Sequence, residues 1–118
     1  MSKPAEIEAA ARHFQELAHS FDYAGMRAAT TSDFEFLMFG ERMSLDDFEA
    51  MLRGLEAERD GQPMGTYEIF DFHTRIVADV AYSNWLSDEW LESSIFVRVG
   101  DRWLMDQAFA IPIEPAED

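Results

Sequence analysis

The order in which helical and strand patterns follow one another is the strongest constraint that this sequence places on its fold. Helical repeats of apolar residues over 6–21 and 22–29 precede a strand pattern at 33–39 and a third helix at 44–59. Aromatic-rich strand patterns then occupy 66–76, 79–86, 90–99 and 102–113 almost without interruption. Helices at the front of the chain and strands at the back predict an α+β fold, with the helices on one face of a sheet. That arrangement makes a cup that can hold a small molecule.

Size and composition favour a single domain over 1–118. The chain is long enough to bury a core, and 47% of its residues are hydrophobic, which argues against disorder. No apolar run approaches the ~20 residues of a membrane span, and the N-terminus lacks the apolar stretch of a signal peptide. The absence of cysteine excludes disulfides and thiolate catalysis. We therefore expect a cytoplasmic protein, with residues 114–118 frayed.

The charge of the chain argues against two classes of partner. There are 24 acidic and 9 basic residues, and the net charge is -15. Such a surface repels phosphate backbones and anionic lipids, so we expect no nucleic-acid partner and no membrane partner. The charge otherwise indicates solubility, and a cationic ligand or partner is the alternative that it leaves open.

Local signals define the third helix and the last hairpin. Ser44 and Asp47 have the spacing of a capping box, in which each side chain binds the backbone of the other residue. Asp22 is the expected cap of the short second helix. Gly100 and Asp101 form a two-residue turn signal between two strand patterns.

Several of these segments occur together in one known superfamily. They are the end of the first helix at Phe21-Asp22, the strand at 33–40, Ser44 at a helix start, the strand start at 78–81, and the segment 99–103. Over residues 6–113 the chain resembles the nuclear transport factor 2-like superfamily, and within it the SnoaL-like and ketosteroid-isomerase-like proteins. The resemblance implies a curved antiparallel sheet of about five to six strands wrapped around N-terminal helices. This cystatin-like cone has one central pocket and usually forms a homodimer, but it hosts both enzymes and non-catalytic proteins.

The resemblance allows the isomerase chemistry to be tested residue by residue. That chemistry uses a tyrosine on the first helix, a carboxylate base near the end of the first strand, and a protonated acid on a later strand. The corresponding positions hold Phe14, then Leu37 or Met38, and Ile95. All are apolar, so we expect that this protein is not a ketosteroid isomerase.

The same alignment predicts the residues that face the pocket. Alternation along the strands places Asp106 inside as the tentative acid or base, because a carboxylate in an apolar cup has the raised pKa that proton transfer needs. The alternative is that Asp106 lies at the solvated rim or pairs with an arginine. The predicted ligand-binding residues are Phe14, Ala18, Met51, Tyr82, Asn84, Ile95 and Val97. For Tyr82 and Asn84, hydrogen bonds that serve only the core are the alternative.

The opposite face of the sheet is predicted to form an interface. If Tyr82 faces the pocket, Trp85 faces outward, together with Met105 and Phe109 from the last strand. Large apolar residues on an exposed face usually mark an association surface, so we expect a homodimer.

The histidines give no metal site. Asp71 and His73 share a strand face, but two ligands do not make a site, and packing at the surface is the simpler interpretation. We expect no metal and no cofactor.

Two functions remain open from the sequence. The first is binding of a small apolar molecule, with proton-transfer chemistry of the isomerase, dehydratase or cyclase type. The second is a non-catalytic association module or accessory subunit. A cup of several hundred Å3 with Asp106 at its base would favour the first. A pocket filled by Phe14, Phe36, Phe48 and Met51 would favour the second.

Overall fold

The computed structural model describes residues 2–113, and the predicted frayed tail at 114–118 lies outside this range. Within it, every predicted helix and strand is present, and one short strand, β2, is added. The elements are α1 (Pro4–His19), α2 (Tyr23–Ala28), β1 (Thr30–Met38), β2 (Glu41–Ser44), α3 (Leu45–Glu58), β3 (Phe70–Val77), β4 (Val80–Leu86), β5 (Trp90–Val99) and β6 (Arg102–Pro112). At four residues, β2 is too short to show a strand periodicity.

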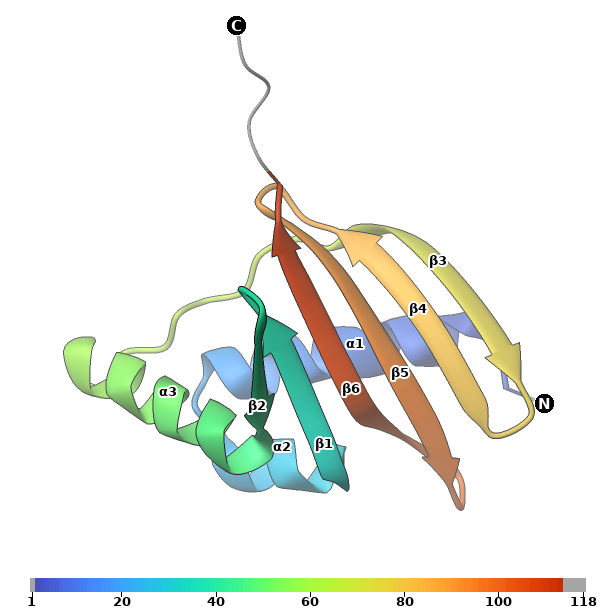
Figure 1. Ribbon diagram of the computed structural model, residues 1–118, viewed down its shortest axis with the longest axis horizontal. Helices are drawn as coiled ribbons and strands as arrows, with labels where there is room; N and C mark the ends of the chain where they lie inside the picture. Colours follow the sequence, from blue (N-terminus) through green and yellow to red (C-terminus); the bar gives the residue numbers. More distant parts are fainter. Residues whose placement is uncertain (1, 114–118) are drawn as a thin grey trace, which may run out of the picture.

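The six strands form one open sheet in the order β2-β1-β6-β5-β4-β3 (Figure 1). Neighbouring strands are antiparallel except β1 and β6, which are parallel. The α+β cone fold is confirmed, but the expected antiparallel sheet is mixed at this one pair. The reason is the path of the chain: α3 and the linker after it lead from the β2 edge to the far edge, and the meander from β3 to β6 then returns to β1.

The helices cover one face of the sheet. The α1 helix crosses behind the strands in Figure 1, and α3 lies beyond the β1–β2 edge. Pro4 occupies the first turn of α1, where its missing N–H costs nothing. No helix among residues 2–113 is long and apolar enough to span a membrane.

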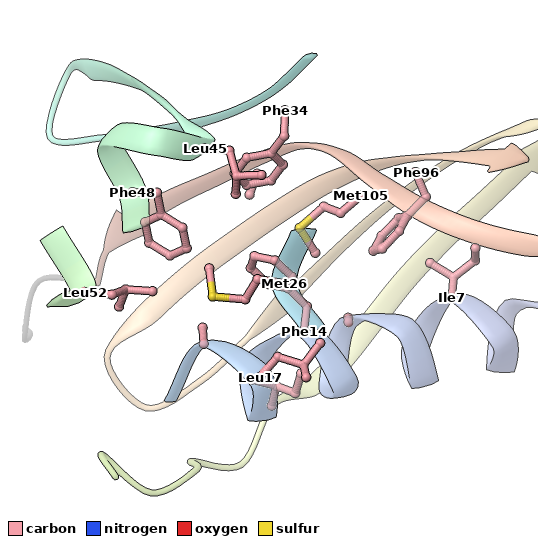
Figure 2. Packing of buried hydrophobic residues seen from close by; sticks show 14 of the residues in the cluster. Ile7, Phe14, Leu17, Met26, Phe34, Leu45, Phe48, Leu52, Phe96 and Met105 are labelled. Carbon is pink, nitrogen blue, oxygen red and sulfur yellow. The ribbon is translucent and has the colours of Figure 1, made fainter. Parts of the chain in front are cut away.

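The core forms between the helix layer and the sheet. Figure 2 shows side chains from all three helices meeting side chains from β1, β5 and β6. Ile7, Met26, Phe34 and Phe96 are almost completely buried. Each buried side chain of this size contributes about 1.5–3 kcal/mol of transfer free energy, so this layer holds α1 on the sheet.

The turn between α1 and α2 depends on Asp22, which caps α2, and on Gly25, which has no side chain. The Asp22 side chain accepts a hydrogen bond from the Gly25 N–H at 2.9 Å and so caps α2, as predicted. A Cβ atom at Gly25 would lie 2.5 Å from Leu17 Cδ2. Gly25 therefore lets α2 approach α1 closely, and a larger residue would displace the side chains of Leu17 and Asp22.

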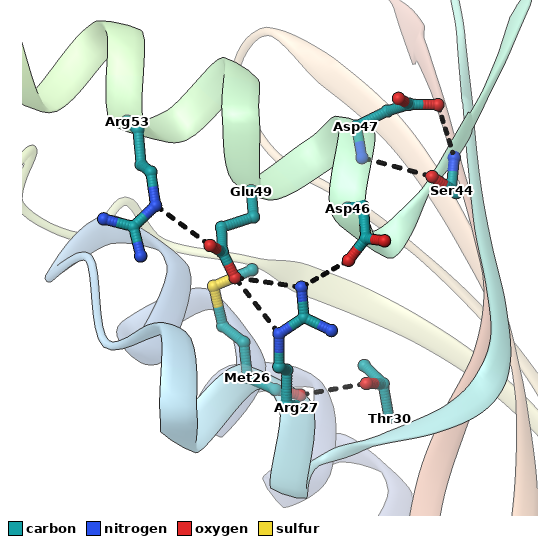
Figure 3. A network of polar contacts seen from close by, with 8 residues as sticks. All are labelled: Met26, Arg27, Thr30, Ser44, Asp46, Asp47, Glu49 and Arg53. Atoms are coloured by element: carbon teal, nitrogen blue, oxygen red, sulfur yellow. Dashed lines mark hydrogen bonds and ion pairs between the residues drawn. The ribbon is translucent and has the colours of Figure 1, made fainter.

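The capping box of α3 is confirmed. The Asp47 N–H donates to Ser44 Oγ at 3.1 Å, and the Ser44 N–H donates to Asp47 Oδ2 at 3.2 Å (Figure 3). Two N–H groups that the first helical turn would leave unpaired are thus satisfied. The cap fixes where α3 begins and therefore where Phe48 and Leu52 enter the core.

The substitution Ser44→Ala is expected to lower the free energy of unfolding by ~1 kcal/mol, the usual contribution of an N-cap. The Asp47 N–H loses its acceptor, while no buried group is disturbed. Urea unfolding of the two proteins measures the difference. A midpoint equal to that of the wild type would mean that Ser44 does not stabilise the helix start.

An ionic network connects α2 to α3. Arg27 donates to Asp46 Oδ1 at 2.6 Å and to Glu49 Oε1 at 3.1 Å, and Arg53 donates to Glu49 Oε2 at 2.9 Å (Figure 3). The arginines are about half-exposed, so the pairs contribute little stability. They connect Arg27 of α2 to the N-terminal half of α3.

Candidate functional site

A small cavity lies between α1 and the helix-covered face of the sheet. Its volume is about 80 Å3. An apolar protein cavity of about 150 Å3 holds benzene, so this one suits a smaller molecule. The apolar lining residues are Ala11, Phe14, Ala18, Phe36, Phe48, Ile69, Trp85, Met105, Ala108 and Phe109, and the polar ones are Gln15, His19, Glu92 and Ser94.

Phenylalanine rings narrow one side of the cavity. The Phe36 and Phe48 rings stack with centroids 4.8 Å apart, and Phe14 stacks on Phe48 at 6.3 Å. These residues come from β1, α3 and α1, so three elements must meet for this wall to form. Met51, which the sequence placed with them, packs against the core but does not line the cavity.

Glu92 is the one carboxylate among the lining residues. Its Oε2 accepts a hydrogen bond from the Trp85 indole Nε1–H at 2.8 Å. Its Oε1 accepts a longer one from the Tyr67 hydroxyl at 3.3 Å. Trp85 and Glu92 are directly opposite each other on β4 and β5, so the sheet register itself fixes the first contact.

The surroundings of Glu92 favour its protonated form. Burial raises the pKa of the Glu92 carboxyl above its usual range, and the hydrogen bonds from Trp85 and Tyr67 and the charge of His19 oppose this shift. A carboxyl group with a raised pKa, next to an apolar cavity, is suited to give or take a proton.

The linker between α3 and β3 contributes Ile69 to the cavity wall and Tyr67 as a hydrogen-bond donor to Glu92. It is held to α1 at His19, whose Nδ1–H donates to the Gly65 carbonyl and whose own carbonyl accepts from the Met64 N–H. The His19 and Tyr67 rings lie 5.3 Å apart. Burial and the neighbouring Glu92 raise the pKa of the Tyr67 hydroxyl, so Tyr67 remains a hydrogen-bond donor at neutral pH.

Sequence reasoning missed Glu92, His19 and Tyr67 as site residues. A signal for Glu92 was present, since closing the β4–β5 hairpin around Ser87 pairs Trp85 with Glu92. Tyr67 falls within the strand predicted over 66–76, but β3 begins only at Phe70, and residues 66–69 form a linker without regular structure.

The placement of Asp106 in the pocket is wrong. Ile95 pairs with Gln107 and Phe96 pairs with Met105, so Asp106 is the extra residue of a β-bulge. The bulge turns its side chain away from the cavity, and Oδ1 accepts a hydrogen bond from the Thr31 hydroxyl at 2.7 Å. Asp106 is half-buried and does not line the cavity.

The predicted register of β4 and β5 is also wrong, by one residue. Tyr82, Asn84, Ile95 and Val97 lie on the outer face, where Tyr82 is 47% exposed. Both faces of β4 carry apolar residues, so the alternation does not distinguish inside from outside. The inner positions hold Ala81, Ser83 and Trp85 instead.

The predicted interface residues do not share one face of the sheet, because the predicted strand register is wrong. Trp85 and Met105 are 4% and 3% exposed and belong to the core, so they cannot form the outer surface. Phe109 is 40% exposed and borders a groove on the outer face, although it also borders the cavity. Of the predicted ligand-binding residues, Phe14 and Ala18 line the cavity.

Asp71 and His73 form an exposed pair, with Oδ1 and Nε2 3.3 Å apart. Neither residue lines the cavity. Among residues 2–113, no group of three or more histidine, aspartate or glutamate side chains could hold a metal ion.

Comparison with known proteins identifies the architecture. No family model matches this chain, and no curated protein matches it. One similar structure is that of an NTF2-like (nuclear transport factor 2-like) protein from Cytophaga hutchinsonii. The two structures superpose with a TM-score of 0.80 at 12% sequence identity, and the match covers 96% of this chain and 100% of that one. This chain has the NTF2-like fold. The predicted fold is therefore confirmed.

Other proteins with the NTF2-like fold superpose almost as well. One from Novosphingobium aromaticivorans, described as having a cystatin-like fold, has a TM-score of 0.75 at 13% identity, over 95% of this chain and 82% of that one. One from Parabacteroides distasonis, provisionally described as a ketosteroid isomerase, has a TM-score of 0.71 at 12% identity, over 97% and 90%. At these identities the likeness concerns the fold and leaves the activity open.

Proposed function

We propose that this protein binds a small molecule in the cavity between α1 and the sheet, and that Glu92 exchanges a proton with it. The observation that carries the proposal is that a partly buried carboxylate lines an otherwise mainly apolar cavity. Such a group is costly to bury, and proteins place perturbed carboxylates of this kind mainly at functional sites.

The neighbours of Glu92 support a role in proton transfer. Trp85 and Tyr67 each donate a hydrogen bond to one oxygen of the Glu92 carboxyl group, and these bonds fix its plane. Each oxygen has a second lone pair, which can accept a hydrogen bond from a bound molecule. Gln15 and Ser94 offer further polar contacts at the cavity wall. Carbon acids, whose deprotonation begins isomerisation and dehydration, are the matching substrate class.

The proposal excludes ketosteroid isomerisation. The positions that would carry that chemistry hold Phe14, Leu37 or Met38, and Ile95. A cavity of about 80 Å3 is also too small for a four-ring compound without rearrangement of its walls. The description of the Parabacteroides distasonis protein therefore supports proton transfer as a class but not its steroid substrate.

A ligand screen tests the proposed function. Small carbonyl compounds that bind are expected to raise the melting temperature of the wild type and not that of Ala108→Leu, which fills the cavity from β6. The control Ala50→Leu makes the same change on an exposed face of α3 and should preserve the response. Compounds that stabilise the wild type and Ala108→Leu equally would bind outside the cavity and contradict the proposal.

The second candidate function is association through the outer face of the sheet. Leu37, Tyr82, Ile95 and Phe109 surround a mainly apolar groove of about 210 Å3 on this face. Exposed apolar patches of this kind mark interaction surfaces. We propose a homodimer formed here, which is compatible with a ligand-binding cavity on the opposite face.

The substitution Phe109→Glu is expected to weaken the dimer by at least ~30-fold in Kd, since a central aromatic residue typically contributes ~2 kcal/mol or more. Sedimentation at micromolar concentration measures the shift toward the 13.6 kDa monomer. Val77→Glu adds the same charge at the exposed end of β3 and should leave the dimer intact. A wild type that sediments only as the monomer would end the dimer proposal.

A further inference from the structure

Among residues 2–113, the carboxylate of Glu92 has hydrogen-bond donors but no ion-pair partner within 4.0 Å, and the charge of His19 acts on it only from a longer distance. Trp85 and Tyr67, which bind its two oxygens, are both neutral. Among residues 2–113, the ion pairs involve other acidic side chains, and none includes Glu92. Burying an ionised carboxylate without a counter-ion costs more than burying a paired one.

The basic side chains near the cavity have other partners. The Arg12 guanidinium donates to the Ile69 carbonyl at 3.2 Å and lies 4.8 Å from the centroid of the Phe72 ring. His19 lines the cavity, but its Nδ1–H is bound to the Gly65 carbonyl. Neither side chain forms an ion pair with Glu92, so the position of a counter-ion is open to a ligand.

The walls of the cavity suit a positive charge. Aromatic side chains from four elements line it, namely Phe14, Phe36, Phe48 and Trp85. Aromatic rings attract organic cations within about 6 Å, and the attraction grows when water is excluded. The net charge of -15 adds a field that raises the local concentration of cations.

The volume of the cavity limits the size of the ligand. About 80 Å3 is roughly half the volume of the apolar cavity that holds benzene. A compact ion of about three non-hydrogen atoms is the matching size.

We infer that the cavity binds a small alkylammonium ion, with Glu92 as its counter-ion and the aromatic side chains around its methyl or methylene groups. This inference rests on the proposed binding function of the same cavity and names its ligand class. The cation also stabilises the ionised form of Glu92.

Two compounds of similar size and different charge test the inference. Ethylammonium chloride and ethanol are titrated into the wild type at constant ionic strength. The readout is the indole N–H resonance of Trp85, identified by its loss in Trp85→Phe. Ethylammonium is expected to bind at least about tenfold more tightly than ethanol, as a desolvated cation–π contact and an ion pair together imply.

Matched variants connect the preference to Glu92. Glu92→Gln removes the charge while keeping the shape of the side chain, and it should abolish the difference between the two compounds. Glu58→Gln removes the same charge from an exposed position at the end of α3 and should preserve the difference. Circular dichroism verifies that both variants are folded.

The outcomes separate this inference from the proposed function. Equal or tighter binding of ethanol in the wild type overturns the cationic ligand but leaves the cavity as a binding site. A preference for ethylammonium that persists in Glu92→Gln also overturns the inference, because surface charge would then explain it. If neither compound shifts the indole N–H resonance of Trp85, the inference fails. The proposed function also fails only when the screen of carbonyl compounds yields no ligand either.

Discussion

Replacement of Trp85 by alanine is expected to lower the free energy of unfolding by about 3–5 kcal/mol, the range for removing a large aromatic side chain from a core. Trp85 is 4% exposed, and its ring lies 5.3 Å from the Phe72 ring. Its indole N–H is also the closer of the two donors to Glu92. The alanine variant therefore creates a cavity and removes a hydrogen bond from a partly buried carboxylate.

The variant Trp85→Phe separates the two losses. It keeps most of the packing and removes only the donor, so we expect a cost of about 1–3 kcal/mol, as for a hydrogen bond to a charged or buried group. Urea unfolding at several protein concentrations gives both values. A loss that depends on protein concentration would instead place Trp85 at a subunit interface, the position that the sequence predicted and the structure contradicts.

The fold was predictable because its local signals agree with one another. Ser44 and Asp47 mark the start of α3, and Gly100 and Asp101 mark the β5–β6 turn. These signals depend on a few neighbouring residues, so they survive without knowledge of the tertiary structure. The parallel pairing of β1 with β6 depends on where a distant strand returns, and no local signal specifies it.

The site was less predictable because it depends on strand register. Tyr82 and Trp85 differ by an odd number of positions, so they lie on opposite faces, and a shift of one residue exchanges them. Apolar residues on both faces of β4 and β5 made the two registers equivalent in sequence. The bulge at Asp106 then changed the face of this residue, while Ala108 and Ala110 of the same strand are buried.

Glu92 illustrates how much of the site could be predicted from the sequence. The predicted loop at 87–89 already implied that Trp85 and Glu92 are cross-strand partners. Cross-strand neighbours have Cβ atoms about 5 Å apart, so a hydrogen bond between an indole and a carboxylate is reasonable there. The inward direction of the pair, and the approach of Tyr67 from the linker, required the three-dimensional structure.

The substitution Glu92→Gln is expected to slow proton transfer in the cavity by about 100-fold or more, the scale of a lost general acid or base. The amide oxygen can still accept the hydrogen bond from Trp85, but the side chain can no longer take or release a proton. NMR measurement of deuterium exchange at the acidic C–H of a compound from the ligand screen gives the rate. Asp106→Asn is the matched control and should leave the rate unchanged, since Asp106 does not line the cavity.

Loss of the folded state would not explain a slower Glu92→Gln variant. Burial raises the pKa of Glu92, so the folded protein retains this proton to higher pH than the unfolded chain does. The contribution of Glu92 to stability is therefore complete below its unfolded pKa and is lost as the pH rises through the folded pKa. The uncharged glutamine avoids that loss, so the variant should be at least as stable as the wild type at neutral pH. A stable Glu92→Gln variant with the wild-type rate would show that Glu92 transfers no proton, and association through the outer sheet face would then be the better proposal.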